Sequence, residues 1–163
     1  MPATSEGATA HRSIILADEA ATASLAAALA RQARSGDVLT LSGPLGAGKT
    51  SFARAFIAAL GVRDEVPSPT FTLVQTYETA VATVWHFDLY RLTGPDEVHE
   101  LGLDEALIDG IVLIEWPERL GTLLPRERLD VVLQPGAGVD SRQATLHGTA
   151  RWQVPLTEMS ADG

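Results

Sequence analysis

The sequence predicts an α/β fold whose central strands run in parallel. Three observations lead to this prediction. A leucine-rich and β-branched run at 37–42 leads into a glycine-rich loop, and an amphipathic helical pattern follows that loop. A second apolar run lies at 111–116, after further helical sequence. Strands separated by helices pair in parallel because each helix carries the chain back to the same edge of the sheet, so we expect these two runs to form a parallel centre.

The first half of the chain adds one strand and two helices. Residues 1–12 lack an apolar pattern and are expected to form a mobile tail, followed by a strand at the apolar residues 13–16. An alanine-rich helix should begin after the N-cap Asp18, whose side chain can accept from free N–H groups, and end at Gly36. The next helix is expected at 50–61, where phenylalanine, isoleucine and leucine recur at helical spacing.

The second half is expected to contain two antiparallel hairpins with a helical segment between them. The helical segment, 93–110, has Thr93 as a candidate cap and Gly102 as a break between two pieces. Pro117 ends the apolar strand that follows, because proline has no N–H group to donate to a sheet. Apolar runs bounded by turn residues predict the hairpin strands at 66–78, 83–90, 129–134 and 142–148.

Length and composition restrict the class of protein. A chain of 163 residues, 45% of them hydrophobic, suits a single globular domain, expected at 13–154 with a C-terminal tail at 155–163. The absence of cysteine excludes disulfides and cysteine-bound zinc. No apolar run reaches the about 18 residues of a membrane span, and the N-terminus lacks a secretory signal, so we expect a cytoplasmic protein without a membrane partner. The formal charge of −9 argues against direct, strong binding of tRNA or DNA.

The loop GPLGAGKT, residues 43–50, contains the only lysine of the chain, Lys49. It matches the phosphate-binding pattern G-x-x-x-x-G-K-[ST] between a strand and a helix, the context of the P-loop NTPase fold. Glycines leave backbone N–H groups free to face phosphates, the ammonium of Lys49 can reach the β- and γ-phosphates, and the Thr50 hydroxyl can bind Mg²⁺. We therefore expect ATP and Mg²⁺ here, and GTP is disfavoured because the guanine-reading motif N-K-x-D needs a second lysine. The candidate nucleotide-binding residues are Gly43, Gly46, Ala47, Gly48, Lys49, Thr50 and Ser51.

Nucleotide hydrolysis also needs a carboxylate near the metal, and two candidates end apolar strands. Asp88 ends the run VWHFD, and Glu115 ends the run IVLIE. The carboxyl ends of parallel strands meet at the edge of the sheet where a phosphate loop lies, so either carboxylate can hold Mg²⁺ or orient the attacking group. Thr70 lies in a Ser-Pro-Thr turn, which is either a rigid turn or a switch that senses the γ-phosphate and the metal.

Four motifs in this order resemble the bacterial TsaE family, also called YjeE. They are GPLGAGKT, SPTF, HFDLYRL and EWPERL, and they lie between residues 43 and 120. The first motif is common to many nucleotide-binding proteins, whereas the last two are specific to the family. The resemblance implies a P-loop NTPase fold with a parallel core sheet flanked by antiparallel strands and helices. It also implies ATP hydrolysis in threonylcarbamoyladenosine biosynthesis through binding to the TsaB–TsaD heterodimer, so that tRNA is contacted only indirectly.

The resemblance also implies roles for individual residues. Thr50 and Glu115 match the positions that bind Mg²⁺. Asp88 matches an acid needed for nucleotide binding or hydrolysis, and Thr70 matches a switch-like threonine. The positions expected near the adenine are Glu19 and Arg142.

Two other functions stay open on the residues themselves. The arginine-bearing segment 119–128 resembles the mobile lid of a small-molecule kinase of P-loop type, and it is equally a solvated loop. A nucleotide-binding interaction module without useful turnover is the third hypothesis. The short chain leaves little room for a domain that binds a kinase acceptor, which favours hydrolysis over phosphoryl transfer to a metabolite.

Overall fold

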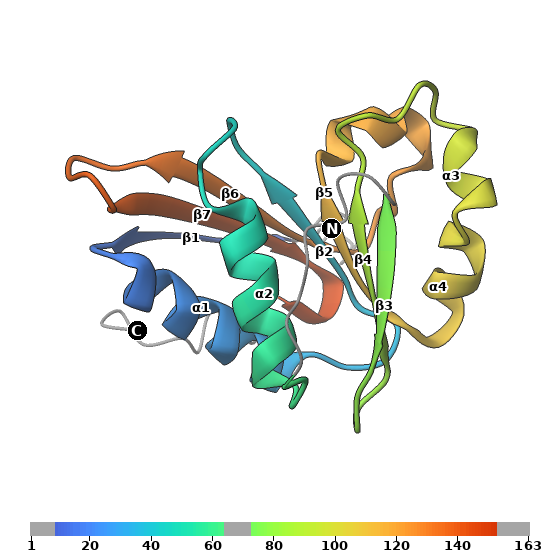
Figure 1. Cartoon of the computed structure of the whole chain (residues 1–163), viewed down its shortest axis with the longest axis horizontal. Coiled ribbons are helices and arrows are strands. Elements are labelled where there is room, and N and C mark those ends of the chain that lie inside the picture. The colour runs from blue at the N-terminus through green and yellow to red at the C-terminus, as the bar shows by residue number, and fades with distance from the viewer. Residues whose placement is uncertain (1–8, 64–72, 153–163) are drawn as a thin grey trace, which may run out of the picture.

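The computed structural model describes residues 9–63 and 73–152, and these residues form one mixed sheet with helices on both faces (Figure 1). Within that part of the chain, the sheet has seven strands in the order β1-β7-β6-β2-β5-β4-β3. The strand bounds are β1 Thr9–Leu16, β2 Val38–Ser42, β3 Val74–Glu78, β4 Thr83–Asp88, β5 Ile111–Glu115, β6 Leu129–Pro135 and β7 Arg142–Thr149.

The centre of the sheet is parallel, as the sequence predicts. The pairs β6–β2, β2–β5 and β5–β4 are parallel, whereas the pairs β1–β7, β7–β6 and β4–β3 are antiparallel. Every residue of β5 is buried, which is the reason that its sequence reads as an uninterrupted apolar run. Glu115 lies opposite both Leu41 of β2 and Asp88 of β4, so the ends of these three strands meet at one edge.

Helices cover both faces of the sheet and give each face its own core. Figure 1 shows α1 (Glu19–Gln32) and α2 (Lys49–Ala59) on one side of β4, and α3 (Glu97–Glu100) and α4 (Leu103–Asp109) on the other side. The 3-10 segment η1 (Pro117–Leu123) joins the second layer, and a short 3-10 turn, η2 Ala150–Trp152, follows β7. Phe52, Phe56, Leu39 and Leu113 lie in the first core, and Phe87, Val98, Ile114 and Leu120 in the second.

The predicted helix signals are confirmed at two positions. Asp18 is the N-cap of α1, and its Oδ1 accepts from the N–H of Ala21 at 2.8 Å. Gly102 separates α3 from α4 with φ +92°, a left-handed conformation that glycine adopts without strain. Within the described ranges, no helix has the length and apolar character needed to cross a bilayer.

The N-terminal boundary of the domain differs from the prediction. β1 begins at Thr9 rather than at residue 13, because residues 9–12, which carry no apolar pattern, pair with β7, with Arg12 opposite Leu146. These residues therefore belong to the sheet and not to a tail. Residues 1–8 and 153–163, which include the predicted C-terminal tail and the end of the predicted domain, lie outside the described residues.

Three other predicted boundaries are corrected. α1 ends at Gln32 because Ala33 is extended, and the N–H of Gly36 instead donates to the carbonyl of Gly110 at 2.7 Å. Thr93 does not cap α3; the helix begins at Glu97, whose carboxylate accepts from both the N–H and the hydroxyl of Thr93. β4 ends at Asp88, two residues earlier than expected. The first part of the predicted strand 66–78 lies outside the described residues up to position 72.

Candidate nucleotide-binding site

The glycine loop joins the end of β2 to the start of α2, as the sequence predicts. Gly46 and Gly48 have φ of +81° and +99°, so the backbone turns sharply without a side chain in the way. Gly48 is the N-cap of α2 and makes no side-chain capping bond. The N–H groups of the first helical turn are therefore available to an anion, and the helix dipole favours one there.

The first glycine of the loop is required by packing. A Cβ atom built on Gly43 would lie 2.2 Å from the carbonyl oxygen of Leu133 in β6, and Gly43 has φ +143°. No side chain fits at that distance, so only glycine lets the loop leave the sheet beside β6. In contrast, a Cβ atom on Gly46 would meet no atom within 4 Å, which leaves open space over the loop.

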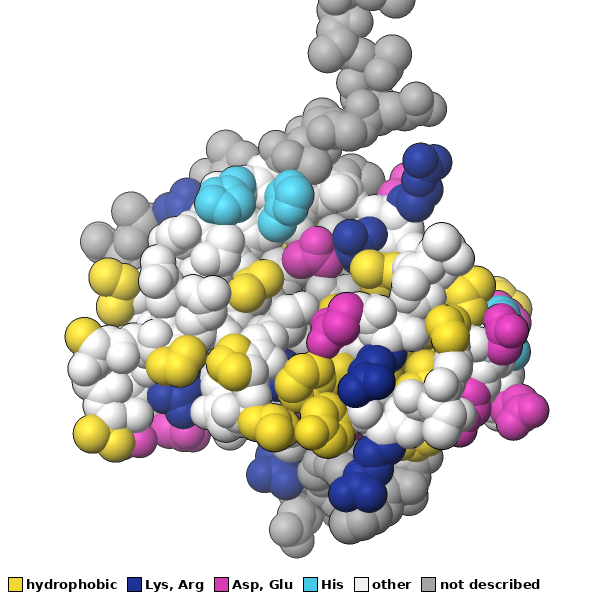
Figure 2. All heavy atoms as spheres, turned by 90° about the horizontal axis from the view of Figure 1, so that it is seen from above, with side chains coloured by type: hydrophobic (Ala, Val, Ile, Leu, Met, Phe, Trp, Pro, Cys, Tyr) yellow, Lys and Arg dark blue, Asp and Glu magenta, His cyan; other side chains and the backbone are white. Residues whose placement is uncertain are grey.

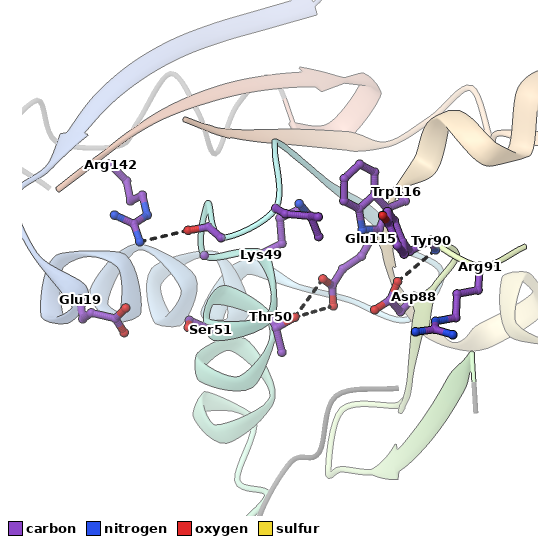
Figure 3. A pocket seen from close by; sticks show the side chains of 13 residues that line it. Glu19, Lys49, Thr50, Ser51, Asp88, Tyr90, Arg91, Glu115, Trp116 and Arg142 are labelled. Carbon is purple, nitrogen blue, oxygen red and sulfur yellow. Dashed lines mark hydrogen bonds between the residues drawn. The ribbon is translucent and has the colours of Figure 1, made fainter. Parts of the chain in front are cut away.

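A pocket of about 380 Å³ lies at this edge of the sheet, above the ends of β4 and β5. Figure 3 shows the side chains around it, and Figure 2, which views the molecule from above, shows apolar and positively charged side chains next to one another on this side. The lining residues come from α1, the loop, α2, the ends of two strands and β7. They are Glu19, Leu45, Gly46, Gly48, Lys49, Thr50, Ser51, Asp88, Tyr90, Arg91, Glu115, Trp116 and Arg142.

Lys49 is buried beside the loop, with only 5% of its surface exposed. Its Nζ donates to the carbonyl of Gly43 at 2.5 Å and to that of Pro44 at 3.0 Å, and it lies 4.1 Å from the ring centroid of Trp116. Burial lowers the pKa of the Lys49 ammonium below its ordinary value, and the carboxylates of Glu115, Glu118 and Asp88 act in the opposite direction. The ammonium is thus held by neutral carbonyls and an aromatic face, contacts that a phosphate oxygen can replace.

The two predicted strand-end acids lie side by side. Glu115 is 2% exposed and Asp88 is 5% exposed, and the two are directly opposite in the β4–β5 register. The Thr50 hydroxyl donates to Oε1 of Glu115 at 3.0 Å, and Nε2 of His86 lies 2.7 Å from Oε2 of Glu115. Oδ1 of Asp88 accepts from the N–H of Tyr90 at 3.1 Å. The fold therefore brings both acids to the start of α2.

The oxygens around Thr50 fit a magnesium ion. Mg²⁺ prefers oxygen ligands and is usually bound by one or two carboxylates together with phosphate oxygens and waters. A hydroxyl and a carboxylate that already face each other supply such ligands. Among the described residues, no group of three His, Cys, Asp or Glu side chains is placed to hold a metal ion.

The other predicted site residues are only partly brought together. Glu19, Ser51 and Arg142 line the pocket, and the Arg142 guanidinium also holds the loop, because Nε donates to the carbonyl of Ala47 at 2.9 Å and Nη2 to that of Gly46 at 3.3 Å. Gly43 and Ala47 lie in the loop but do not line the pocket. Thr70 lies outside the described residues.

Sequence reasoning missed several residues at the pocket. Tyr90 and Trp116 line it and pack against each other, with ring centroids 4.9 Å apart. Trp116 has a left-handed backbone, with φ +61°, which turns the chain away from β5. His86 is the buried partner of Glu115. A signal for His86 existed, because it is two residues before Asp88 and alternate residues of a strand share a face.

Comparisons with known proteins agree with one another. The family model described as "Threonylcarbamoyl adenosine biosynthesis protein TsaE" matches residues 16–144. A protein of Rickettsia felis named tRNA threonylcarbamoyladenosine biosynthesis protein TsaE is 44% identical over 122 residues, which cover 74% of this chain and 71% of that protein. A Bacillus subtilis protein of the same name is 41% identical over 141 residues, covering 85% and 87%. The crystal structure of Bacillus subtilis YdiB superposes with a TM-score of 0.77 at 34% identity, over 93% of this chain and 94% of that one.

Proposed function

The chain belongs to the TsaE family of P-loop proteins, which act in tRNA threonylcarbamoyladenosine biosynthesis, and we propose that within this pathway it is a magnesium-dependent ATPase. The observation that carries the proposal is the contact between Thr50 and Glu115, 3.0 Å long, at the mouth of the loop that holds Lys49. A P-loop ATPase needs a cation for the phosphates and a hydroxyl and a carboxylate for the metal, and all three lie within one pocket.

The residues of the pocket divide the work of hydrolysis among them. The N–H groups at the start of α2 bind the phosphates, and the Lys49 ammonium exchanges the carbonyls of Gly43 and Pro44 for phosphate oxygens. Thr50 and Glu115 would hold Mg²⁺, which would neutralise negative charge on the phosphates.

We assign the attacking water to Asp88. Glu115 contacts Thr50 and His86, which places its carboxylate on the metal side of the site. Asp88 is buried beside Glu115 at the end of β4, and the N–H of Tyr90 fixes one of its oxygens. A carboxylate held in this way can accept a hydrogen bond from water and orient it toward the γ-phosphate.

We further propose that the protein works in the cytoplasm by binding the TsaB–TsaD heterodimer and meets tRNA only through that complex. The family relationship supports the partner, and the formal charge of −9 supports the indirect route, because a surface of that sign repels a phosphate backbone. The role of ATP hydrolysis is then to reset the complex between rounds of modification.

A small-molecule kinase receives less support from the contacts of the 119–128 segment. Arg128 pairs with Asp130 at 2.8 Å and donates to the carbonyl of Pro125, so it is engaged within the fold. Arg119 lies over the Tyr90 ring, 5.9 Å from its centroid. The segment therefore offers fewer phosphate clamps than its sequence indicates.

Phosphate release from ATP tests the proposal directly. The full chain is assayed with and without Mg²⁺, and with and without purified TsaB–TsaD, and the products are separated to distinguish inorganic phosphate from a phosphorylated metabolite. We expect Mg²⁺-dependent release of inorganic phosphate that the partner complex stimulates. A rate of ATP hydrolysis that depends neither on Mg²⁺ nor on the partners, or a phosphorylated small product, would contradict the proposal.

A further inference from the structure

His86 is a polar side chain in an apolar part of the sheet. It lies in β4 between Trp85 and Phe87, and its side chain is completely buried. Val84, His86 and Asp88 share one face of the strand, because alternate residues point the same way. Asp88 lines the pocket and His86 does not, so the imidazole lies behind the pocket wall.

Among residues 9–63 and 73–152, one of the two imidazole nitrogens of His86 has a hydrogen-bond partner. Nε2 lies 2.7 Å from Oε2 of Glu115. A carboxylate only accepts hydrogen bonds, so Nε2 carries the proton and donates. Nδ1 is buried and has no hydrogen-bond partner within the described part of the chain. A buried polar atom without a partner destabilises a fold, and an aliphatic side chain at position 86, like that of Val84 on the same face of β4, would avoid this loss of stability. A histidine at this position therefore indicates that its bond to Glu115 serves function rather than stability.

Glu115 is held from two sides by residues of different elements. The Thr50 hydroxyl of α2 lies 3.0 Å from Oε1 and 3.4 Å from Oε2, and the His86 imidazole of β4 lies 2.7 Å from Oε2. The terminal torsion of a glutamate has a broad energy profile, and the Thr50 hydroxyl reaches both oxygens, so this contact alone does not fix which oxygen faces α2. The shorter His86 bond to Oε2 fixes the carboxylate plane and leaves Oε1 as the oxygen nearer to Thr50.

We propose that His86 is a positioning residue for Mg²⁺: its Nε2–H holds Oε2 of Glu115 so that Oε1 and the Thr50 hydroxyl stay arranged for a shared metal ion. This inference rests on the proposed function, since it concerns the metal of the same site. Carboxylates that bind metals are commonly oriented by such a hydrogen bond, and losing it lowers metal affinity about 10- to 100-fold.

Glutamine and asparagine at position 86 separate positioning from packing. In His86→Gln the amide nitrogen reaches about as far as Nε2 and can donate to Glu115, whereas in His86→Asn it is one methylene shorter and cannot. Calorimetry measures the ATP affinity of the full chain at a series of free Mg²⁺ concentrations, and in EDTA without metal. We expect the half-saturating Mg²⁺ concentration to rise about 10- to 100-fold in His86→Asn and to return to within about threefold of wild type in His86→Gln. His99→Asn, at an exposed position on α3, is the matched control.

Metal-free ATP binding distinguishes the two roles. The proposal requires this affinity to be unchanged in both variants, and it requires saturating Mg²⁺ to restore His86→Asn. Equal Mg²⁺ dependence in wild type and His86→Asn, or an equal loss with and without metal, would overturn it. If wild-type protein bound ATP without any dependence on Mg²⁺, the proposed function would fail as well.

A measurement on wild-type protein keeps the proposal testable if the variants do not fold. Nitrogen NMR of the imidazole distinguishes its tautomers. We expect the proton on Nε2 and a change in its signal when Mg²⁺ is added together with ATP. A proton on Nδ1 alone, or a signal indifferent to Mg²⁺, would refute the assignment.

Discussion

Replacing Glu115 by glutamine removes one negative charge while keeping the shape of the side chain. Glu115 is 2% exposed, accepts from Thr50 at 3.0 Å and is the carboxylate that most strongly opposes the lowered pKa of Lys49. Loss of a metal ligand removes transition-state charge stabilisation worth several kcal/mol, and we take about 3–5 kcal/mol for Glu115. Since 1.36 kcal/mol is a factor of ten in rate, Mg²⁺-dependent turnover should fall about 10²- to 10⁴-fold.

The same substitution should change Lys49 in a measurable direction. Burial lowers the pKa of Lys49, and Glu115 is the first among the three carboxylates that raise it. With a neutral side chain at position 115, burial is unchanged and that opposing charge is gone. The pKa of Lys49 should therefore fall further, which NMR of the lysine side chain can follow, because the chain has a single lysine.

The assay for Glu115→Gln measures phosphate release at saturating ATP across a range of Mg²⁺ concentrations. Glu118→Gln is the matched control: Glu118 is exposed on η1, also acts on Lys49, and does not line the pocket. An exposed charge is worth about 0–1 kcal/mol, so the control should keep turnover within about fivefold. Wild-type turnover in Glu115→Gln would refute the magnesium assignment. Equal losses in both variants would show that charge near Lys49, and not a metal ligand, is responsible.

Three further predictions concern Lys49, the loop glycines and Arg142. Burial lowers the pKa of Lys49, so between the folded-state pKa and the ordinary value of 10.5 the unfolded chain binds more protons than the folded chain. The free energy of unfolding of the nucleotide-free protein should therefore rise with pH across that window. Urea unfolding at a series of pH values measures this slope, and Lys49→Met should remove it. Gly43→Ala should destabilise the protein by about 3 kcal/mol and Gly46→Ala by only about 1–2 kcal/mol, because only the Cβ atom at position 43 meets the backbone of Leu133. Thermal unfolding compares the two variants, and equal losses of stability would contradict the close approach of Gly43 to Leu133. Arg142→Leu removes the hydrogen bonds to two loop carbonyls and should weaken ATP binding about tenfold, which corresponds to about 1.4 kcal/mol. A calorimetric titration measures the ATP affinity. An unchanged affinity would show that the loop keeps its shape without the guanidinium.

The parts of the site that lie close together in sequence could be predicted. The loop from Gly43 to Thr50 has its glycines, its lysine and its hydroxyl within eight consecutive residues, so one short segment indicates its chemistry. The strand-end acids Asp88 and Glu115 could be predicted because parallel strands end at the same edge of the sheet. The N-cap Asp18 is a local signal for the same reason, since its bond spans three residues.

Contacts that depend on strand register could not be predicted. The bond between His86 and Glu115 spans 29 residues and exists only because β4 and β5 pair with Asp88 opposite Glu115. The bond from Arg142 to Ala47 spans 95 residues and depends on where β7 begins. Residues 9–12 have no apolar pattern of their own, and β7 supplies the backbone partners that make them a strand. In each case the stabilising partner is distant in sequence, so a local pattern can indicate the face on which a residue lies but not the partner that it meets.

Calorimetric titration of the full chain with ATP, in the presence and absence of Mg²⁺, tests the central claim most directly. We expect saturable binding to wild-type protein that Mg²⁺ strengthens, and no measurable binding to Lys49→Met, which keeps the length of the side chain and removes its charge. Heat of binding that is the same for both proteins, or absent from wild type under both conditions, would contradict the assignment of this pocket to a magnesium-bound nucleotide.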